Sequence, residues 1–280
     1  MTTPTIQAEL AGAFRAPHNG FQQAAASIHN DEVASKLGFK GGTVPGSVHM
    51  DQFVPLLVEL YGPAWFETGD ISLHFTQATV DREEVQAIAQ PAADRAALRM
   101  VNRAGQQICV GSASPKGPDG GSEVARRMAE QAQAEPGRLR IYAELSPGDT
   151  TADIPMRVAR ADYDAGLERI TERLPLYDEK GVLSPAFAVR LAHMSRPFVL
   201  AKAKPPYVGL FGALEVRQLR GPLLADRDYV GRTTMRKLTE SPKTENAWYD
   251  VEIADAQTGQ DVAAVTFMIR AMKASSPLWG

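Results

Sequence analysis

The order of elements along the chain repeats, because a long apolar helix followed by a run of strands is predicted twice. In the first half, apolar residues recur at the spacing of one helix face, and they are Phe53, Leu56, Leu57 and Leu60. In the second half, the residues at this spacing are Phe187, Leu191, Met194 and Phe198. Pro45 and Pro185 lie near the two helix starts, where the missing N–H of proline costs nothing. A chain of 280 residues with this repeat is expected to form two similar modules.

The segments after each helix predict strands in the same order. Ile71, Leu73 and Phe75 alternate with polar residues, as in a half-buried strand, and 210–216 takes the corresponding place in the second half. A Gly-Gln pair recurs in the last hairpin turn of each half, beginning at Gly105 and at Gly259. Glycine supplies the positive φ that such turns require. The second half therefore follows the plan of the first.

A segment rich in proline and glycine separates the two halves. Residues 115–122 contain few apolar side chains, which is typical of a linker, and 123–134 predicts a short surface helix. We therefore expect a first module over 1–114, a connecting segment over 115–137 and a second module over 138–280.

The segment 27–39 carries the most specific pattern in the chain. Asn30 or Asp31 can cap a short helix, and Gly38 can close it. The segment leads into Pro45-Gly46, where the first long helix begins. This pattern resembles the MaoC-like hydratase/dehydratase family, in which a loop histidine precedes a short helix ending in Gly-Phe. A His-Gly pair then opens the long helix of that family.

The positions that match the family are His29 for the loop histidine, Gly38-Phe39 for the helix end and Pro45-Gly46 for the His-Gly pair. The resemblance covers about 5–112 and, more faintly, 138–273. It implies an α+β fold of two tandem hot-dog modules, a double hot-dog. In each module, a curved antiparallel sheet would wrap around the long central helix. It also implies an acyl-thioester substrate, carried by coenzyme A or by an acyl carrier protein.

The chain departs from the family at the positions that hold its catalytic acid. That acid stands five residues before the histidine, where this chain has Ala24, and an asparagine three residues before the histidine is replaced by Ala26. The family histidine before the helix glycine is Pro45. The second half has no histidine before Ser184 either. The general acid/base pair that the resemblance implies is therefore half missing.

Hydration of an enoyl thioester needs a base for water and a donor for the thioester oxygen. His29 can be the base, since the ordinary imidazole pKa lies near neutral pH, although it can also simply pack in its loop. Gly46 can present a backbone N–H at a helix start, or can merely allow a tight turn. Asp51 on the first long helix is an alternative base, because hot-dog thioesterases place a carboxylate on that helix; a solvent-facing or dimer-facing Asp51 is the other interpretation.

The remaining candidates for the pocket are residues expected to contact substrate, namely His49, Val48 and Phe75. His49 lies four residues before Phe53, on the same helix face. His193 lies away from the apolar face of its predicted helix, so we expect it to face solvent or an interface.

Composition and motifs exclude several classes of protein. The formal net charge of -3 argues against a nucleic-acid partner, and the longest apolar stretch, 53–60, is too short to cross a membrane. No metal or cofactor is expected, since the five histidines have no ligand-like spacing. Cys109 is the single cysteine and lies in the apolar run Ile108-Cys109-Val110, so it is expected to be a small buried residue. The N-terminus shows no signal peptide, which predicts a cytoplasmic protein.

Three functions stay open from the sequence. The first is a hydratase or dehydratase of acyl thioesters, a hydro-lyase. The second is a thioesterase on the same scaffold. The third is a non-catalytic acyl-thioester binding protein, which Ala24 favours. The two modules can supply within one chain the pairing that two subunits supply elsewhere, and a further homodimer is left open.

Overall fold

The computed structural model describes residues 8–24, 27–117 and 119–280, so Ala26 lies outside the described residues. Their strands form one ten-stranded sheet in which every neighbouring pair is antiparallel. The strands are β1 (Leu10–Ala11), β2 (Asp70–Phe75), β3 (Val85–Gln90), β4 (Ala96–Asn102), β5 (Gln107–Ser114), β6 (Ile154–Met156), β7 (Gly209–Gln218), β8 (Tyr229–Glu240), β9 (Thr244–Asp255) and β10 (Asp261–Met272).

The strand order shows the repeat directly. It runs β1-β3-β4-β5-β2-β7-β10-β9-β8-β6, so the first half and the second half are arranged as mirror orders about β2 and β7. These two strands pair from Asp70↔Arg217 to His74↔Ala213. One sheet per module was expected, and this pairing joins the two sets of strands into a single sheet. The division at 115–137 and the wrapping of a sheet around each helix stay predictions.

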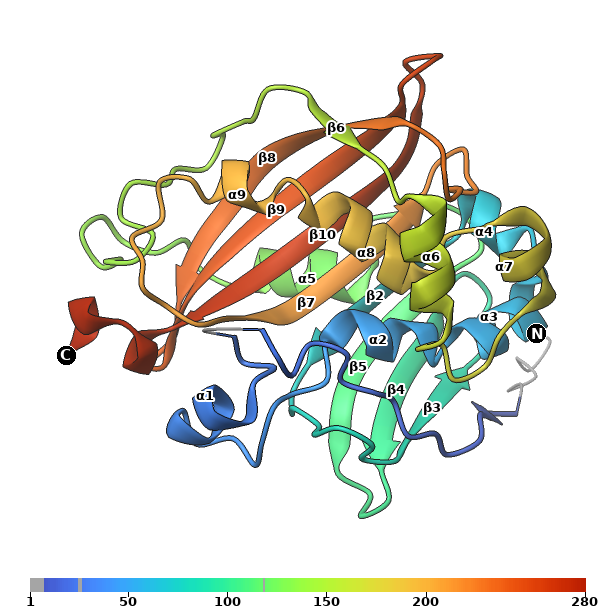
Figure 1. The fold of residues 1–280 in the computed structure, drawn as a ribbon, viewed down its shortest axis with the longest axis horizontal. Coiled ribbons are helices and arrows are strands. Elements are labelled where there is room, and N and C mark those ends of the chain that lie inside the picture. The colour runs from blue at the N-terminus through green and yellow to red at the C-terminus, as the bar shows by residue number, and fades with distance from the viewer. Residues whose placement is uncertain (1–7, 25–26, 118) are drawn as a thin grey trace, which may run out of the picture.

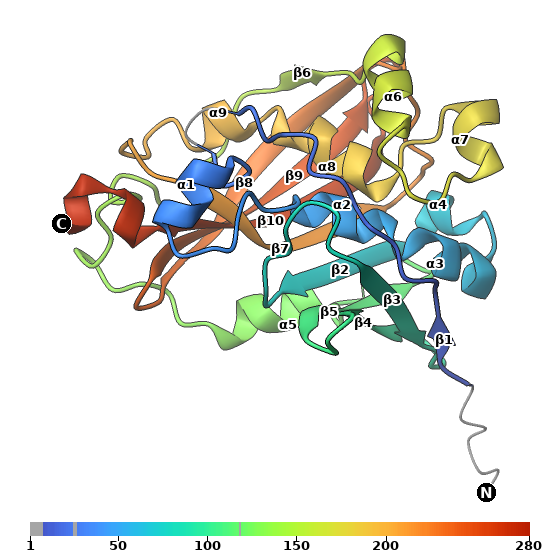
Figure 2. The same ribbon diagram turned by 60° about the horizontal axis from the view of Figure 1, so that its bottom comes forward.

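The helices lie on both faces of the sheet. They are α1 (Asp31–Lys36), α2 (Gly46–Asp51), α3 (Val54–Tyr61), α4 (Trp65–Thr68), α5 (Glu123–Glu130), α6 (Arg160–Leu167), α7 (Pro175–Lys180), α8 (Pro185–His193) and α9 (Arg196–Val199), followed by two 3₁₀ turns at Lys273–Ser275 and Pro277–Trp279. Helices α2 and α8 lie side by side on one face (Figure 1). Helix α5 packs against β2, β5 and β7 on the opposite face (Figure 2).

The long helices predicted for the two halves are both interrupted. Helix α2 ends at Asp51 and α3 begins at Val54, because Pro55 has no N–H to donate to the carbonyl of Asp51. In the second half, α8 ends at His193 and α9 follows. Met194 and Phe198 are 43% and 59% exposed, so the prediction that they continue the apolar face of this helix was wrong.

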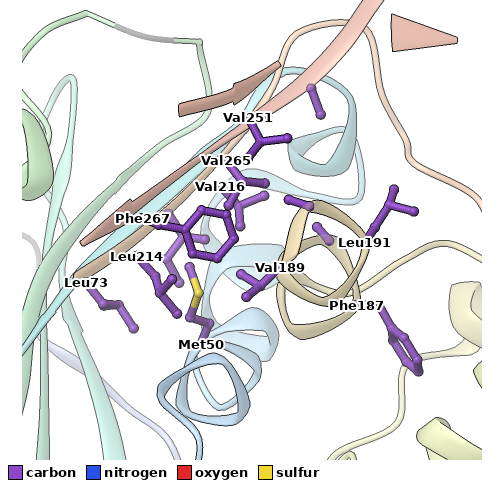
Figure 3. Close-up of a cluster of buried hydrophobic side chains, with 14 of the residues drawn as sticks. Met50, Leu73, Phe187, Val189, Leu191, Leu214, Val216, Val251, Val265 and Phe267 are labelled. Atoms are coloured by element: carbon purple, nitrogen blue, oxygen red, sulfur yellow. The ribbon is translucent and has the colours of Figure 1, made fainter. Parts of the chain in front are cut away.

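One hydrophobic core is shared by the two halves. Met50 of α2 and Val189 of α8 lie between their helices and the sheet, next to Leu73, Leu214 and Phe267 (Figure 3). Burial of a side chain of this size stabilises a fold by about 1.5–3 kcal/mol. The helices that carry the candidate site residues are therefore fixed by packing between the modules as well as within them.

The connecting segment also contributes to packing. Ser122 caps α5 by accepting the N–H of Ala125, and Val124 is buried against Ala213 and Trp248. Cys109 is fully buried in β5, as expected. Among the helices of the described ranges, none has the length and apolar character needed to cross a membrane.

Candidate functional site

A cavity of about 1350 Å³ lies between the two halves of the molecule and takes side chains from both. The pairing of β2 with β7 ends at His74↔Ala213, and Phe75 and Phe211, just beyond it, line the cavity. All six residues predicted for the site line it: His29, Gly46, Val48, His49, Asp51 and Phe75. They thus line one cavity, and their roles stay predictions.

The loop that carries His29 is held by polar contacts on both sides. Asn30 caps α1 by accepting the N–H groups of Glu32 and Val33, and the side-chain amide of Asn19 donates to the His29 carbonyl at 2.8 Å. Gly42 passes so close that a Cβ there would lie 2.2 Å from the same carbonyl oxygen. The backbone of His29 therefore has little freedom to move.

The hydrogen bond made by His29 fixes its tautomer. Its Nδ1 lies 2.7 Å from the carbonyl oxygen of Thr43, and a carbonyl can only accept, so Nδ1 carries the proton and Nε2 keeps a lone pair. Burial lowers the pKa of His29 below its ordinary value, and the hydrogen bond to Thr43 raises it in part. At neutral pH this imidazole is a neutral base on the wall of the cavity.

Among the residues that the structure describes, no carboxylate forms a hydrogen bond with the His29 side chain. Ala24, at the position of the expected family acid, also lines the cavity. Asp31 does not cap α1, since Asn30 does so, and its carboxylate instead accepts the N–H of Gly42 at 2.7 Å. In the described part of the chain, the candidate base is therefore oriented chiefly by the carbonyl of Thr43, without a carboxylate.

His193 was expected to face solvent or an interface, and the structure shows that this prediction was wrong. Its ring lies in the cavity wall, 5.5 Å from the ring of Phe211 and 5.9 Å from that of Phe267, measured between centroids. Burial lowers the pKa of His193 to about 4, with smaller contributions from the charges of Arg196 and His29. The two histidines, one from each half, therefore line the same cavity.

The sequence contained one weak sign of this position. Val189 stands four residues before His193, and residues at this spacing share a helix face. Val189 also lines the cavity. The face of α8 that seemed polar borders the cavity, since Ala186, Arg190 and His193 line it.

Gly46 is the first residue of α2, and the N–H groups of a first helical turn have no acceptor within the helix. A Cβ at this position would lie 2.6 Å from a ring carbon of Phe75. Glycine is therefore required for the ring of Phe75 to lie against the helix start. This contact places the backbone N–H groups and an aromatic wall at one end of the cavity.

Asp51 joins the two halves. Its two carboxylate oxygens accept the hydroxyl of Ser184 and the N–H of Ala186, each at 2.9 Å, so it caps the start of α8 from α2. Burial raises the pKa of Asp51 to about 7, although these two hydrogen bonds lower it in part. A negative charge at a helix start is favourable, which partly compensates its burial.

The raised pKa of Asp51 predicts a pH-dependent stability. The folded state holds this proton up to about pH 7, whereas the unfolded chain releases it near 3.8, so stability falls as pH rises through this window. We expect Asp51→Asn to reduce this slope while keeping an acceptor for the Ala186 N–H. Urea unfolding of both proteins across the window measures it. Parallel curves of stability against pH for the two proteins would show that Asp51 does not titrate in this window. Burial also raises the pKa of Glu215 to about 7, so Glu215 accounts for any pH dependence that remains in Asp51→Asn.

His49 lies deeper in the wall than the sequence suggested. It is 2% exposed, its Nε2 lies 2.8 Å from the Thr79 hydroxyl, and burial lowers its pKa to about 4. Its Nδ1 has no hydrogen-bond partner among the residues with described positions. Within those same residues, no group of three or more side chains is arranged to bind a metal ion.

Comparison with known proteins establishes the fold. No family model matches the sequence, and no curated protein matches it. The structure is similar to a putative MaoC domain protein dehydratase from Chloroflexus aurantiacus J-10-fl, with a TM-score of 0.64, 8% identity and 95% of each chain covered. It is also similar to a conserved hypothetical protein from Mycobacterium tuberculosis with a double hotdog fold, with a TM-score of 0.58, 10% identity and coverage of 95% of this chain and 97% of the other.

A third similar structure is the dehydratase domain from the CurJ module of curacin polyketide synthase, with a TM-score of 0.50 and 14% identity over 97% of this chain and 95% of that one. The chain therefore has the double hot-dog fold, which the sequence resemblance implied. The similarity spans nearly the whole chain, so both halves take part in this fold.

Proposed function

We propose that this chain binds acyl thioesters in the cavity between its two modules and acts on them as a hydratase or dehydratase. The observation that carries the proposal is the neutral His29, whose Nε2 has no hydrogen-bond partner among the described residues and which lines a cavity that also contains the start of α2. Similar double hot-dog structures include dehydratases, which supports the same reaction class. The carrier is coenzyme A or an acyl carrier protein.

In the hydration direction, His29 acts first as a base. Nε2 takes a proton from water as the water oxygen bonds to C3 of the enoyl thioester, and the electron pair of the C2–C3 double bond moves towards the thioester oxygen. The N–H of Gly46 stabilises that oxygen, and one donor of this kind typically contributes about 10²–10³ in rate. The imidazolium then returns the proton to C2. Water is thus added across the double bond, and dehydration is the reverse.

The direct test is turnover of a trans-2-enoyl thioester by the purified protein. We expect the ultraviolet absorbance of the conjugated thioester to fall and a product heavier by one water to form. Release of free thiol from a saturated acyl thioester would instead identify a thioesterase. Stabilisation of the protein by the thioester without any reaction would identify a binding protein.

Specific observations bear on both alternatives. Ala24 and the missing carboxylate partner of His29 favour a binding protein. A thioesterase would use Asp51 as its base and would lose activity in Asp51→Asn. Both oxygens of Asp51 accept hydrogen bonds from the start of α8, so we assign it a positioning role and expect Asp51→Asn to keep hydratase activity.

A further inference from the structure

Arg196 is a cation on the cavity wall. It begins α9, is partly buried and lines the cavity. Within the described ranges, its guanidinium has neither an ion-pair partner nor a hydrogen-bond partner, and Nη2 lies 3.7 Å from the place of a Cβ on Gly209. Two other cavity arginines differ, since Arg138 pairs with Glu240 at 2.7 Å and Arg190 with Asp162 at 3.4 Å.

A phenol side chain lines the same cavity as this guanidinium. It is Tyr207, and the ring of Tyr142 meets it edge-on at 5.8 Å. Burial raises the pKa of Tyr207, Tyr142 and Tyr249, and the charge of Arg196 lowers each in part. The Tyr249 hydroxyl is fully buried and, among the described residues, has no hydrogen-bond partner. Buried polar groups without partners are rare in folded proteins.

A row of rings connects His193 on the cavity wall to Tyr249. His193, which lines the same cavity as His29, stacks with Phe267 at 5.9 Å, and Phe267 stacks with Tyr249 at 4.9 Å. Arg196 follows His193 by three residues. Because His29, His193 and Arg196 all line this one cavity, a ligand whose reacting carbons lie at His29 can extend through the cavity to Arg196.

We propose that the cavity accepts acyl groups with a carboxylate at the end distant from the thioester, and that Arg196 binds this carboxylate. The substrates would be monothioesters of dicarboxylic acids. A guanidinium matches a carboxylate with two parallel hydrogen bonds, and the hydroxyl of Tyr207 adds a donor. A plain alkyl end would leave the cation unpaired against an apolar chain, which is unfavourable. The choice of substrate rests on the proposed function, whereas the binding it requires does not depend on turnover.

The test compares saturated coenzyme A thioesters, which cannot be hydrated, by titration calorimetry. One acyl group ends in a carboxylate, and its partner of equal length ends in a methyl group. We expect the wild-type protein to bind the carboxylated thioester at least about tenfold more tightly, since charged hydrogen bonds are strong. Arg196→Gln should lower the affinity for the carboxylated thioester by about 10- to 100-fold and leave the affinity for the methyl-ended thioester nearly unchanged. Arg196→Lys should keep part of the preference.

Arg169 provides a matched control. Like Arg196, it lines the cavity and has no ion pair in the described part of the chain. Its guanidinium lies elsewhere, over the exposed ring of Phe21 and 5.9 Å from the ring centroid. Arg169→Gln should keep the carboxylate preference. If Arg196→Gln weakens the binding of both thioesters equally, the proposal is overturned and Arg196 is assigned to the phosphates of the carrier. N-acetylcysteamine thioesters, which lack phosphate, would then bind equally well to the wild-type and variant proteins. A wild-type protein without the preference would also overturn it. A protein that binds with the preference but shows no turnover would contradict only the hydratase function.

Discussion

Replacement of His29 by glutamine is expected to lower kcat/KM for hydration of a trans-2-enoyl thioester by about 10²–10⁴-fold, the usual contribution of a general base. The glutamine amide can still donate to the carbonyl of Thr43, which now accepts from Nδ1 at 2.7 Å. It has no basic nitrogen to take a proton from water. The loop should therefore keep its shape while the reaction loses its base.

The measurement is the initial rate of absorbance loss, with thermal unfolding as a check on the fold. His18→Gln is the matched control, because His18 pairs with Asp81 at 2.8 Å and is not among the cavity-lining residues. It should leave the rate unchanged. Normal turnover in His29→Gln would remove His29 from the mechanism, and unchanged binding of a saturated thioester would separate lost chemistry from lost affinity.

The same base should define the pH profile of the wild-type enzyme. Burial lowers the pKa of His29 below 6.5, so the imidazole stays unprotonated at neutral pH and becomes protonated only in more acidic solution. We expect kcat/KM to be level at neutral pH and to fall on the acid side with an apparent pKa below 6.5. A fall that is complete at neutral pH would indicate that another group titrates.

Local sequence signals predicted the parts of the fold that depend on neighbouring residues. The glycine turns at Gly105 and Gly259 both have positive φ, and β7 covers the predicted strand 210–216. The break at Pro55 was readable in principle, since proline ends the hydrogen bonding of the preceding turn. The apolar residues keep their helical spacing across Pro55, so the spacing alone predicts one uninterrupted helix.

Only the part of the candidate site that lies within one segment of the chain could be predicted from the sequence. His29 and Gly46 belong to one continuous segment with a recognisable pattern, so their proximity follows from chain connectivity. His193 and Arg196 reach the same cavity only because α8 packs beside α2, and within their own segment only the spacing between Val189 and His193 is a weak sign of it. The link from Asp51 to Ser184 spans the two halves in the same way. Side chains that meet through tertiary packing cannot be paired by spacing alone.

Replacement of Arg95 by methionine is expected to destabilise the fold by about 3–5 kcal/mol, because it leaves a buried charge without its partner. Arg95 donates to both carboxylate oxygens of Asp70, at 2.6 and 2.8 Å. The side chain of Asp70 is fully buried. Asp70 also lies at the joint of the two halves, since it pairs with Ser114 of β5 and with Arg217 of β7.

Two further variants separate this mechanism from a general effect of losing an arginine. Arg99→Met removes an ion pair with Glu9 in which the two side chains are 43% and 42% exposed, and exposed pairs contribute about 0–1 kcal/mol. The double variant Arg95→Met with Asp70→Leu should recover much of the loss, because no isolated charge then remains buried. Urea unfolding measures all three. Equal destabilisation by Arg95→Met and Arg99→Met would mean that Asp70 is protonated or hydrated without Arg95, and the joint between β2 and β7 would then depend on backbone pairing and apolar packing alone.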